Sequence, residues 1–325
     1  MNHLKNKTNL GFFPTPVEFL PRISAKLQQN IYIKRDDQTG LATGGNKTRK
    51  LEYLVKNALD LGANALITIG GQQSNHCRQT AAAAAKVGLQ CYLILRGEKP
   101  ENFQGNLLLD KVLGANLIFA GDKDLFQEIK LLSQNLKNEG VNAYEITMGG
   151  SDEVGCLGYV NAVQELKNQE IELSFEFDEI YFSTSSGGTQ AGLVLGKRMF
   201  DLKAQIIGVS NDKSNMDGLS LDEYILNVVK KAQKNLLFEE KISISEIQIL
   251  KEYNEAGYGV VTENELFAIK ELAQTEGIIL DPVYTARAFW GMLDSLKNIK
   301  KQGKKNILFW HTGGQSANFS YHSIF

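Results

Sequence analysis

Short apolar segments rich in β-branched and aromatic residues recur along the chain. They begin at Ile31, Ala65, Cys91, Leu117, Glu179, Ile206 and Ile307. Because each segment is short and almost continuously hydrophobic, the pattern predicts strands that are largely buried. Strands of this kind are typical of parallel sheets with helices packed on either side.

Segments with helical spacing lie between these predicted strands. One runs from Leu51 to Leu61 and another from Leu266 to Ala273, each with apolar residues three or four positions apart. Strand followed by helix, repeated along the chain, predicts an α/β fold with parallel sheets. Four such units fall between Leu51 and Cys156 and at least three follow, which is more than one sheet comfortably carries. The pattern therefore predicts two α/β domains with a cleft between them.

Composition and charge narrow the class of partner. The 325 residues are 43% hydrophobic, enough for a sizeable core, and 35 Lys and Arg against 37 Asp and Glu leave a net charge of -2. This balance lacks the basic excess that nucleic-acid or membrane binding usually needs, which favours a small-molecule partner. The first residues lack the apolar core of a signal peptide and no apolar run approaches bilayer-spanning length, so we expect a cytoplasmic protein.

The cysteines do not indicate a structural framework. Cys77, Cys91 and Cys156 are odd in number, widely spaced and without a zinc-ligand pattern. Disulfide frameworks are typical of small secreted domains, which this chain does not resemble in length. We therefore expect reduced thiols with a structural role, and no metal site.

A glycine-rich turn precedes the helix predicted near Leu51. Gly44, Gly45 and Asn46 lead into Lys47, and glycines at such a turn let the backbone approach a ligand closely. A solvated surface lysine beside a turn fits the same pattern equally well, so this motif alone does not decide the role of Lys47. The residue order of a Walker motif is missing, so nucleotide binding on that pattern is not predicted.

Two further glycine-rich turns follow predicted strands directly. Gly70 and Gly71 lead to Ser74, which can cap an alanine-rich helix whose free N–H groups attract a carboxylate, although most such turns are merely capped. The second turn, residues 183–192, combines hydroxyls and glycines between an apolar strand and a helix predicted near Thr189. Several donors can there surround one phosphate, which we favour over a flexible Ser/Gly loop.

In their order along the chain, these segments resemble the D-cysteine desulfhydrase and aminocyclopropanecarboxylate deaminase family of fold-type II pyridoxal-phosphate enzymes. The resemblance covers nearly the whole chain and is carried by PTPVEFLPR, IYIKRDD, GGNKTRKLEYL, QSNHCRQTAA, SSGGTQAG, TEGIILDPVYT and HTGG. It implies a tryptophan synthase β-like fold, pyridoxal 5'-phosphate in the cleft, and an amino acid as substrate. Members are commonly homodimers, so a homodimer is expected. We expect a large domain of residues 1–51 and 157–325 and a small inserted domain of residues 52–156.

The resemblance assigns cofactor-binding residues position by position. Lys47 matches the lysine that bonds covalently to the cofactor, and Lys50, one helical turn later, matches the residue that reaches its phosphate. Asn75 matches the side chain that hydrogen-bonds the phenolic oxygen of the cofactor, and Thr285 stands at the position facing the pyridine nitrogen. The phosphate-binding loop corresponds to Ser185, Ser186, Gly187, Gly188 and Thr189.

Catalytic and substrate-binding residues follow from the same resemblance. Lys47 is expected to remove the Cα proton, and Ser74 with the helix behind it to receive the substrate carboxylate. Tyr258 and Tyr284 match two active-site tyrosines of the family, whose separate roles the sequence leaves open. The expected substrate-binding residues are Ser74, Asn75, His76 and Thr312.

Two positions favour one activity of the family. The deaminases place a Glu after the DPVY tyrosine, where it protonates the pyridine nitrogen, whereas this chain has Thr285. A neutral hydroxyl supplies no full charge, so the cofactor ring withdraws electrons less strongly. The weaker electron withdrawal suffices for loss of a good leaving group but disfavours opening of a cyclopropane. The deaminases also carry Leu after the final His, where this chain has Thr312. Both positions predict α,β-elimination of D-cysteine to pyruvate, ammonia and hydrogen sulfide.

Three alternatives stay open. The first is 1-aminocyclopropane-1-carboxylate deaminase activity, and the second is a sulfo-lyase acting on cysteate with the same lysine and phosphate loop. The third is a binding protein that keeps the fold without turnover, against which the intact Lys47 and Ser74 argue. Product analysis with different β-substituents separates the first two from the predicted activity.

Overall fold

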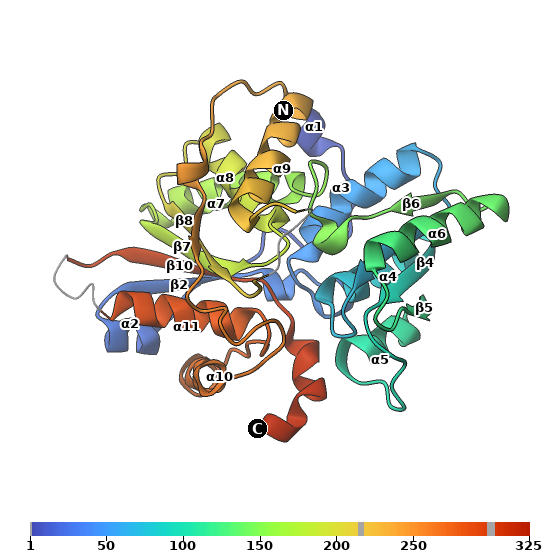
Figure 1. Ribbon diagram of the computed structural model, residues 1–325. Coiled ribbons are helices and arrows are strands. Elements are labelled where there is room, and N and C mark those ends of the chain that lie inside the picture. Colours follow the sequence, from blue (N-terminus) through green and yellow to red (C-terminus); the bar gives the residue numbers. More distant parts are fainter. Residues whose placement is uncertain (1, 214–217, 298–302) are drawn as a thin grey trace.

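The computed structural model describes residues 2–213, 218–297 and 303–325. Its strands form two sheets that lie side by side, each with helices on both faces (Figure 1). One sheet has six strands in the order β1-β2-β10-β7-β8-β9, and the other has four in the order β5-β4-β3-β6. Every pairing is parallel except that of β1 with β2, so the predicted α/β class with two largely parallel sheets is confirmed.

The six-stranded sheet is built from both ends of the chain. Its strands are β1 (Val17–Phe19), β2 (Asn30–Arg35), β7 (Glu179–Thr184), β8 (Gln205–Ser210), β9 (Gln248–Leu250) and β10 (Asn306–His311). One face packs against α1 (Asn2–Lys5), α7 (Leu157–Leu173), α8 (Gly188–Met199) and α9 (Leu221–Leu236). The other face packs against α2 (Pro21–Leu27), α10 (Glu263–Glu276) and α11 (Thr285–Leu296). Each face thus has its own apolar core.

The four-stranded sheet comes from one continuous stretch. Its strands are β3 (Ala65–Gly70), β4 (Gln90–Leu95), β5 (Asn116–Phe119) and β6 (Ala143–Glu145). One face is covered by α3 (Lys47–Asp60), α4 (Asn75–Val87) and α5 (Gly105–Val112), and the other by α6 (Leu125–Asn138). Helix α3 packs against both α4 and α7, and so connects the two sheets. The domain boundaries at residues 51/52 and 156/157 stay a prediction.

All seven strands expected from apolar runs are confirmed, whereas three short strands were missed. The missed strands, β1, β6 and β9, each have three residues and lie at sheet edges. None of their residues is fully buried, so they lack the continuous hydrophobicity that reveals a central strand. Short 3-10 turns occupy Asp36–Gln38, Leu41–Thr43, Met148–Gly150, Ile244–Glu246, Gln315–Ser320 and His322–Ile324. Within the described ranges, no helix is both long and apolar enough to cross a bilayer.

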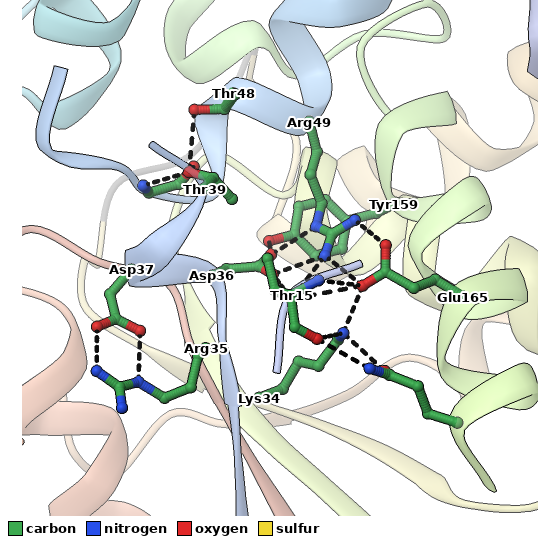
Figure 2. A network of polar contacts seen from close by, with 12 residues as sticks. Thr15, Lys34, Arg35, Asp36, Asp37, Thr39, Thr48, Arg49, Tyr159 and Glu165 are labelled. Atoms are coloured by element: carbon green, nitrogen blue, oxygen red, sulfur yellow. Dashed lines mark hydrogen bonds and ion pairs between the residues drawn. The ribbon is translucent and has the colours of Figure 1, made fainter. Parts of the chain in front are cut away.

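A buried network of charged side chains joins α3 to the six-stranded sheet (Figure 2). Arg49 on α3 donates from Nε and Nη2 to Asp36, both at 2.8 Å, and from Nη1 and Nη2 to Glu165, both at 2.9 Å. Lys34 on β2 also bonds Glu165, and Tyr159 on α7 donates to Asp36 at 2.6 Å. Burial opposes ionisation of Asp36, but the Arg49 guanidinium prevails and lowers the carboxyl pKa to about 2. The network fixes α3 against β2 and α7.

Candidate active site

A cavity of about 440 Å³ lies at the carboxyl ends of strands from both sheets. Gly70 at the end of β3, Thr184 at the end of β7 and Thr312 just after β10 all line it. Ligands of open parallel sheets bind at this edge, because the strand ends lead into loops and helix N-termini there. The cavity is therefore the candidate active site.

Most of the residues expected from the sequence meet in this cavity. Those on its wall are Lys47, Ser74, Asn75, His76, Ser185, Ser186, Gly187, Thr189, Tyr258, Tyr284 and Thr312. The wall as described does not include Lys50, Gly188 or Thr285. These three are buried and contact residues that do line the cavity, or directly adjoin them in the chain. The residues expected from the sequence thus lie at one cavity, and the structure distinguishes those on its wall from the three that lie behind it.

Lys47 begins α3 and points its amine toward the cavity. Its Nζ lies 3.1 Å from Oδ1 of Asn46. Burial lowers the pKa of Lys47 to about 8, an effect enhanced by Arg78 and opposed by the carboxylate of Asp281. A pKa near 8 keeps a useful fraction of uncharged amine at neutral pH, which nucleophilic attack and proton abstraction both require.

An anion cradle lies beside Lys47, at the N-terminus of α8. Lys50 is buried beneath it, with its Nζ 3.0 Å from the carbonyl oxygen of Gly149 and 3.2 Å from Oγ of Ser151. No carboxylate forms an ion pair with Lys50 in the part of the chain that the structure describes. A Cβ atom at Gly188 would lie 2.7 Å from Cα of Ser151 and 2.9 Å from Lys50 Nζ, and because the first is a backbone atom, glycine is required there. A buried cation next to free helix N–H groups is suited to a phosphate.

The N-terminus of α4 forms the opposite wall. Ser74 caps this helix, and its Oγ accepts a hydrogen bond from the backbone N–H of Cys77 at 3.2 Å. Asn75 Oδ1 accepts from Nδ2 of Asn106 at 2.8 Å, which turns Asn75 Nδ2 away from Asn106 with protons to donate. A Cβ atom at Gly314 would lie 2.8 Å from that Nδ2, so the turn after β10 must approach closely here. The arrangement offers donors to an oxygen of a ligand.

His76 lines the cavity but contributes no positive charge. Thr68 Oγ1 donates to the carbonyl oxygen of Ile146 at 2.9 Å, so it can only accept from His76 Nε2, 3.0 Å away. Burial holds the pKa of His76 well below its ordinary value, and the nearby cations Lys47 and Lys50 lower it further. Attraction of a carboxylate to this wall therefore comes from the helix N–H groups and Lys47 rather than from an imidazolium.

Tyr258 and Tyr284 form a hydroxyl pair in the cavity. Their oxygen atoms are 2.5 Å apart, and their rings meet edge to face with centroids separated by 5.9 Å. Burial of the hydroxyl raises the pKa of Tyr258 to about 12, although other parts of its side chain are exposed. Burial also raises the pKa of Tyr284 well above its ordinary value. Both hydroxyls therefore remain protonated at neutral pH and can act as donors.

Thr285 is held by Asp281, a buried carboxylate to which the sequence assigned no role. Thr285 Oγ1 donates to Asp281 Oδ1 at 2.7 Å, and the same carboxylate accepts from the backbone N–H groups of Val283, Tyr284 and Thr285. Burial raises the pKa of Asp281, while these hydrogen bonds favour its ionised form. The lone hydroxyl proton of Thr285 is thus directed to Asp281.

Several cavity residues were missed by the sequence analysis. They include Asn46, Arg96, Leu125, Phe126, Met148 and Asp212. Arg96 directly follows the carboxyl end of β4 and is exposed, so the rule that ligands bind at strand ends was the signal that could have found it. Leu125 and Phe126 lie at the start of α6, and only the packing of that helix brings them to the cavity.

Comparisons with known proteins agree with this geometry. The model of the family described as pyridoxal-phosphate dependent enzyme matches residues 8–313. A D-cysteine desulfhydrase of Klebsiella pneumoniae subsp. pneumoniae is 40% identical over 319 residues, which cover 95% of this chain and 94% of the relative. A putative 1-aminocyclopropane-1-carboxylate deaminase of Pyrococcus abyssi is 39% identical over 310 residues, with coverage of 94% and 91%.

Solved structures lead to the same fold. One described as an ACC deaminase homologue has a TM-score of 0.90 at 38% identity and covers 99% of this chain and 97% of its own. Threonine deaminase isoform 2 of Solanum lycopersicum has a TM-score of 0.68 at 16% identity, with coverage of 96% and 83%, and supports the fold alone.

The fold and the cavity define a pyridoxal 5'-phosphate enzyme of fold-type II. The chain belongs to the family that contains the D-cysteine desulfhydrases and 1-aminocyclopropane-1-carboxylate deaminases, as its resemblance predicted. The residues present fit the cofactor, because a buried lysine amine stands beside a phosphate cradle whose own cation, Lys50, forms no ion pair with the described acidic residues. Lys47, Lys50 and the loop from Ser185 to Thr189 would hold it.

Replacing Lys50 with methionine is expected to weaken cofactor binding by about 10- to 100-fold, since a hydrogen bond to a charged group contributes about 1.5–3 kcal/mol. Because burial holds the pKa of Lys50 well below its ordinary value, the charged form destabilises the cofactor-free fold. The cofactor-free variant should therefore be at least as stable as the parent. Fluorescence titration with the cofactor and urea unfolding measure the two effects. Lys130→Met on the exposed face of α6 is the control. Equal affinities of Lys50→Met and the parent for the cofactor would contradict the role of Lys50 in the anion cradle.

Proposed function

We propose that this pyridoxal-phosphate-dependent enzyme catalyses α,β-elimination of D-cysteine to pyruvate, ammonia and hydrogen sulfide. The observation that supports this choice is the neutral hydroxyl of Thr285 at the start of α11, where the resembling deaminases carry a Glu. The cofactor, when bound, withdraws electrons from Cα and so makes the Cα proton acidic. A thiolate is a good leaving group and needs less electron withdrawal than a carbon–carbon bond of a cyclopropane.

Lys47 would hold the cofactor, and its amine would take the Cα proton of the substrate. Its buried amine has a pKa of about 8, suited to accepting a proton near neutral pH. Ser74 and the N-terminus of α4 orient the substrate carboxylate, which the helix N–H groups attract. Asn75 would donate from Nδ2 to the phenolic oxygen of the cofactor, because its Oδ1 is already held by Asn106.

The tyrosine pair is proposed to serve the leaving sulfur. Tyr258 and Tyr284 both stay protonated because burial raises the pKa of each hydroxyl. A hydroxyl donor near the departing thiolate stabilises the charge that develops on sulfur. Their 2.5 Å contact means that one of the two hydroxyl protons is shared within the pair, which leaves the other for the substrate.

A sulfo-lyase acting on cysteate is a second candidate, favoured by Arg96. This arginine lines the cavity, is exposed, and forms no ion pair with the described acidic residues. A guanidinium there would pair with an anionic β-substituent such as a sulfonate. The third candidate is the deaminase activity after which several relatives are named. It requires the ring nitrogen of the cofactor to be protonated without a neighbouring Glu.

One assay series tests these proposals. Purified holoenzyme is incubated separately with D-cysteine, L-cysteine, cysteate and 1-aminocyclopropane-1-carboxylate, while sulfide, sulfite and keto acid are measured. We expect sulfide and pyruvate in equal amounts from D-cysteine, with kcat/KM at least about tenfold above that for any other substrate, equivalent to about 1.4 kcal/mol. If sulfite is released from cysteate with a higher kcat/KM than sulfide from D-cysteine, the sulfo-lyase activity replaces the proposal. Keto acid from the cyclopropane alone would overturn the argument from Thr285.

Location and oligomeric state are further parts of the proposal. We infer that the enzyme acts in the cytoplasm as a homodimer, as the resemblance to the family suggests. Light scattering of the purified holoenzyme measures the second point. A mass near twice the 36.1 kDa of the chain is expected, and a mass equal to it would contradict the dimer.

A further inference from the structure

Asn46 connects three separate parts of the active site. Its side chain is buried, with 6% of the residue exposed. Its backbone N–H donates to the carbonyl oxygen of Thr312 at 3.0 Å, and its Nδ2 donates to Oγ1 of Thr189 at 3.1 Å. Its Oδ1 accepts from the Nζ of Lys47 at 3.1 Å. The phosphate loop and the lysine amine therefore meet at one carboxamide, and the turn after β10 is bonded to the backbone of the same residue.

The orientation of this carboxamide follows from its partners. The hydroxyl of Thr189 accepts from Nδ2 and keeps its own proton for an anion in the phosphate loop. With Nδ2 turned toward Thr189, Oδ1 must face Lys47. An amide oxygen can hold one N–H of a lysine amine without placing a full negative charge beside it, which leaves the nitrogen lone pair free for reaction.

We propose that Asn46 is a positioning residue that orients the Lys47 amine, accepting one of its N–H groups through a neutral oxygen so that the nitrogen lone pair is directed into the cavity. The carboxamide provides a neutral acceptor at a place where a carboxylate would fit equally well. This inference concerns the lysine itself and does not depend on which amino acid the enzyme consumes.

The charged groups around Lys47 explain why a neutral acceptor matters there. Asp281, before α11, raises the pKa of Lys47, and Arg78 on α4 lowers it, while burial lowers it more than either. Lys50, one turn further along α3, interacts with Lys47 as a like charge, and His76 on α4 is uncharged. A second carboxylate in contact with Nζ would outweigh these cations and favour the ammonium form.

Replacing Asn46 with aspartate tests the inference, because the side chains have nearly the same shape. A carboxylate in contact with an amine raises its pKa by about 1–3 units, so the pKa of Lys47 should rise from about 8 to at least about 9. The pKa is measured in cofactor-free protein, by acetylating Lys47 with acetic anhydride across a pH series and quantifying the labelled peptide by mass spectrometry. No amino acid substrate is present, so failure of this test is distinct from failure of the proposed reaction.

Two comparison variants make the result specific. Asn135→Asp makes the same chemical change on the exposed face of α6 and should leave the pKa of Lys47 unchanged. Asn46→Ala removes the acceptor without adding charge, so it should not raise that pKa. It should slow covalent attachment of pyridoxal 5'-phosphate to the cofactor-free protein by about 10- to 100-fold, because the amine is no longer oriented. Its affinity for pyridoxine 5'-phosphate, which has the phosphate but no aldehyde, should change less than about threefold, a shift below about 0.7 kcal/mol.

Both experiments, the titration of Lys47 and the rate of cofactor attachment, can contradict the inference. An Asn46→Asp variant whose Lys47 titrates like the parent, or an Asn46→Ala variant that takes up the cofactor at the parental rate, would overturn the inference. If Asn46→Asp does not fold, as judged by circular dichroism and a urea transition, the attachment rate of Asn46→Ala decides alone. A loss of pyridoxine 5'-phosphate affinity equal to the loss in attachment rate would indicate general damage to the phosphate loop and would also reject the positioning role.

Discussion

Replacing Lys47 with alanine is expected to lower kcat/KM for the preferred substrate by at least about 10³-fold. A correctly placed acid or base typically contributes 10²- to 10⁴-fold, and this variant also loses the amine that we propose bonds to the cofactor. The amine is buried and has a pKa of about 8, a combination that no surface lysine could reproduce. Steady-state kinetics on D-cysteine measure the loss.

Covalent attachment gives a second measurement of the same variant. Borohydride treatment followed by peptide mass spectrometry should find the reduced cofactor on residue 47 of the parent and on no peptide of Lys47→Ala. Lys56→Ala, further along α3 on a partly exposed position, is the matched control and should behave like the parent. A variant at residue 47 that keeps the cofactor on another lysine and loses less than tenfold in kcat/KM would show that the catalytic lysine lies elsewhere.

Replacing Arg49 with methionine is expected to lower the free energy of unfolding by about 3–5 kcal/mol. Breaking a buried ion pair from one side costs this much, because the remaining carboxylates stay buried without their partner. Arg49 and Asp36 are almost completely inaccessible to solvent, and Glu165 is 11% exposed (Figure 2). Of the cations drawn in Figure 2, Lys34 would then be the one that still contacts Glu165. Urea unfolding at pH 7 measures the change.

The control for Arg49 is an ion pair with ordinary exposure. Lys56 and Asp60 lie four residues apart on α3, with side chains 31% and 49% exposed. Lys56→Met should cost no more than about 0.5 kcal/mol, since exposed helical pairs contribute about 0.3–0.5 kcal/mol. Equal losses for Arg49→Met and Lys56→Met would contradict the structural importance of the buried network.

The Arg49 effect should also depend on pH in one direction. The pKa of Asp36 in the fold is about 2, lowered by Arg49 against the effect of burial, and an unfolded Asp has a pKa of about 3.9. The stabilisation is therefore complete above about pH 4 and is lost as the pH falls through about 2. The stability difference between parent and Arg49→Met should shrink when the urea series is repeated at pH 3. An unchanged difference would show that Asp36 is not the group that Arg49 keeps ionised.

Local sequence determined the strands and most of the cavity wall. Central strands such as β3 and β7 are recognisable because both of their faces are buried, so each contains a short run of consecutive apolar residues. Glycine-rich turns such as that from Ser185 to Thr189 are recognisable for a related reason, because close approach to a ligand restricts the residue type within a few positions. The turns that contain Lys47, Ser74 and residues 185–189 could accordingly be located from the chain alone, while the roles predicted for these residues came from the resemblance to the family.

Residues whose role depends on distant partners could not be placed in this way. Arg49 meets Glu165 across 116 positions, and Asn46 meets Thr189 across 143. No local sequence pattern indicates such a pairing, because Arg49 and Asn46 each look like an ordinary polar residue near the start of a helix. Asp281 was visible in its motif, but its proximity to Lys47 arises only when α11 and α3 converge on the cavity.

The sequence by itself therefore determined the family and the cofactor, and it predicted Lys47 as the lysine that carries the cofactor, since these rest on short segments that match the family. Only the tertiary structure decided how that lysine is tuned. Its pKa depends on burial and on Asp281 and Arg78 from separate elements, and its amine contacts a carboxamide whose Nδ2 bonds Thr189. Burial and Coulomb interactions act through space, and their strength is set by distances that exist only after the chain has folded.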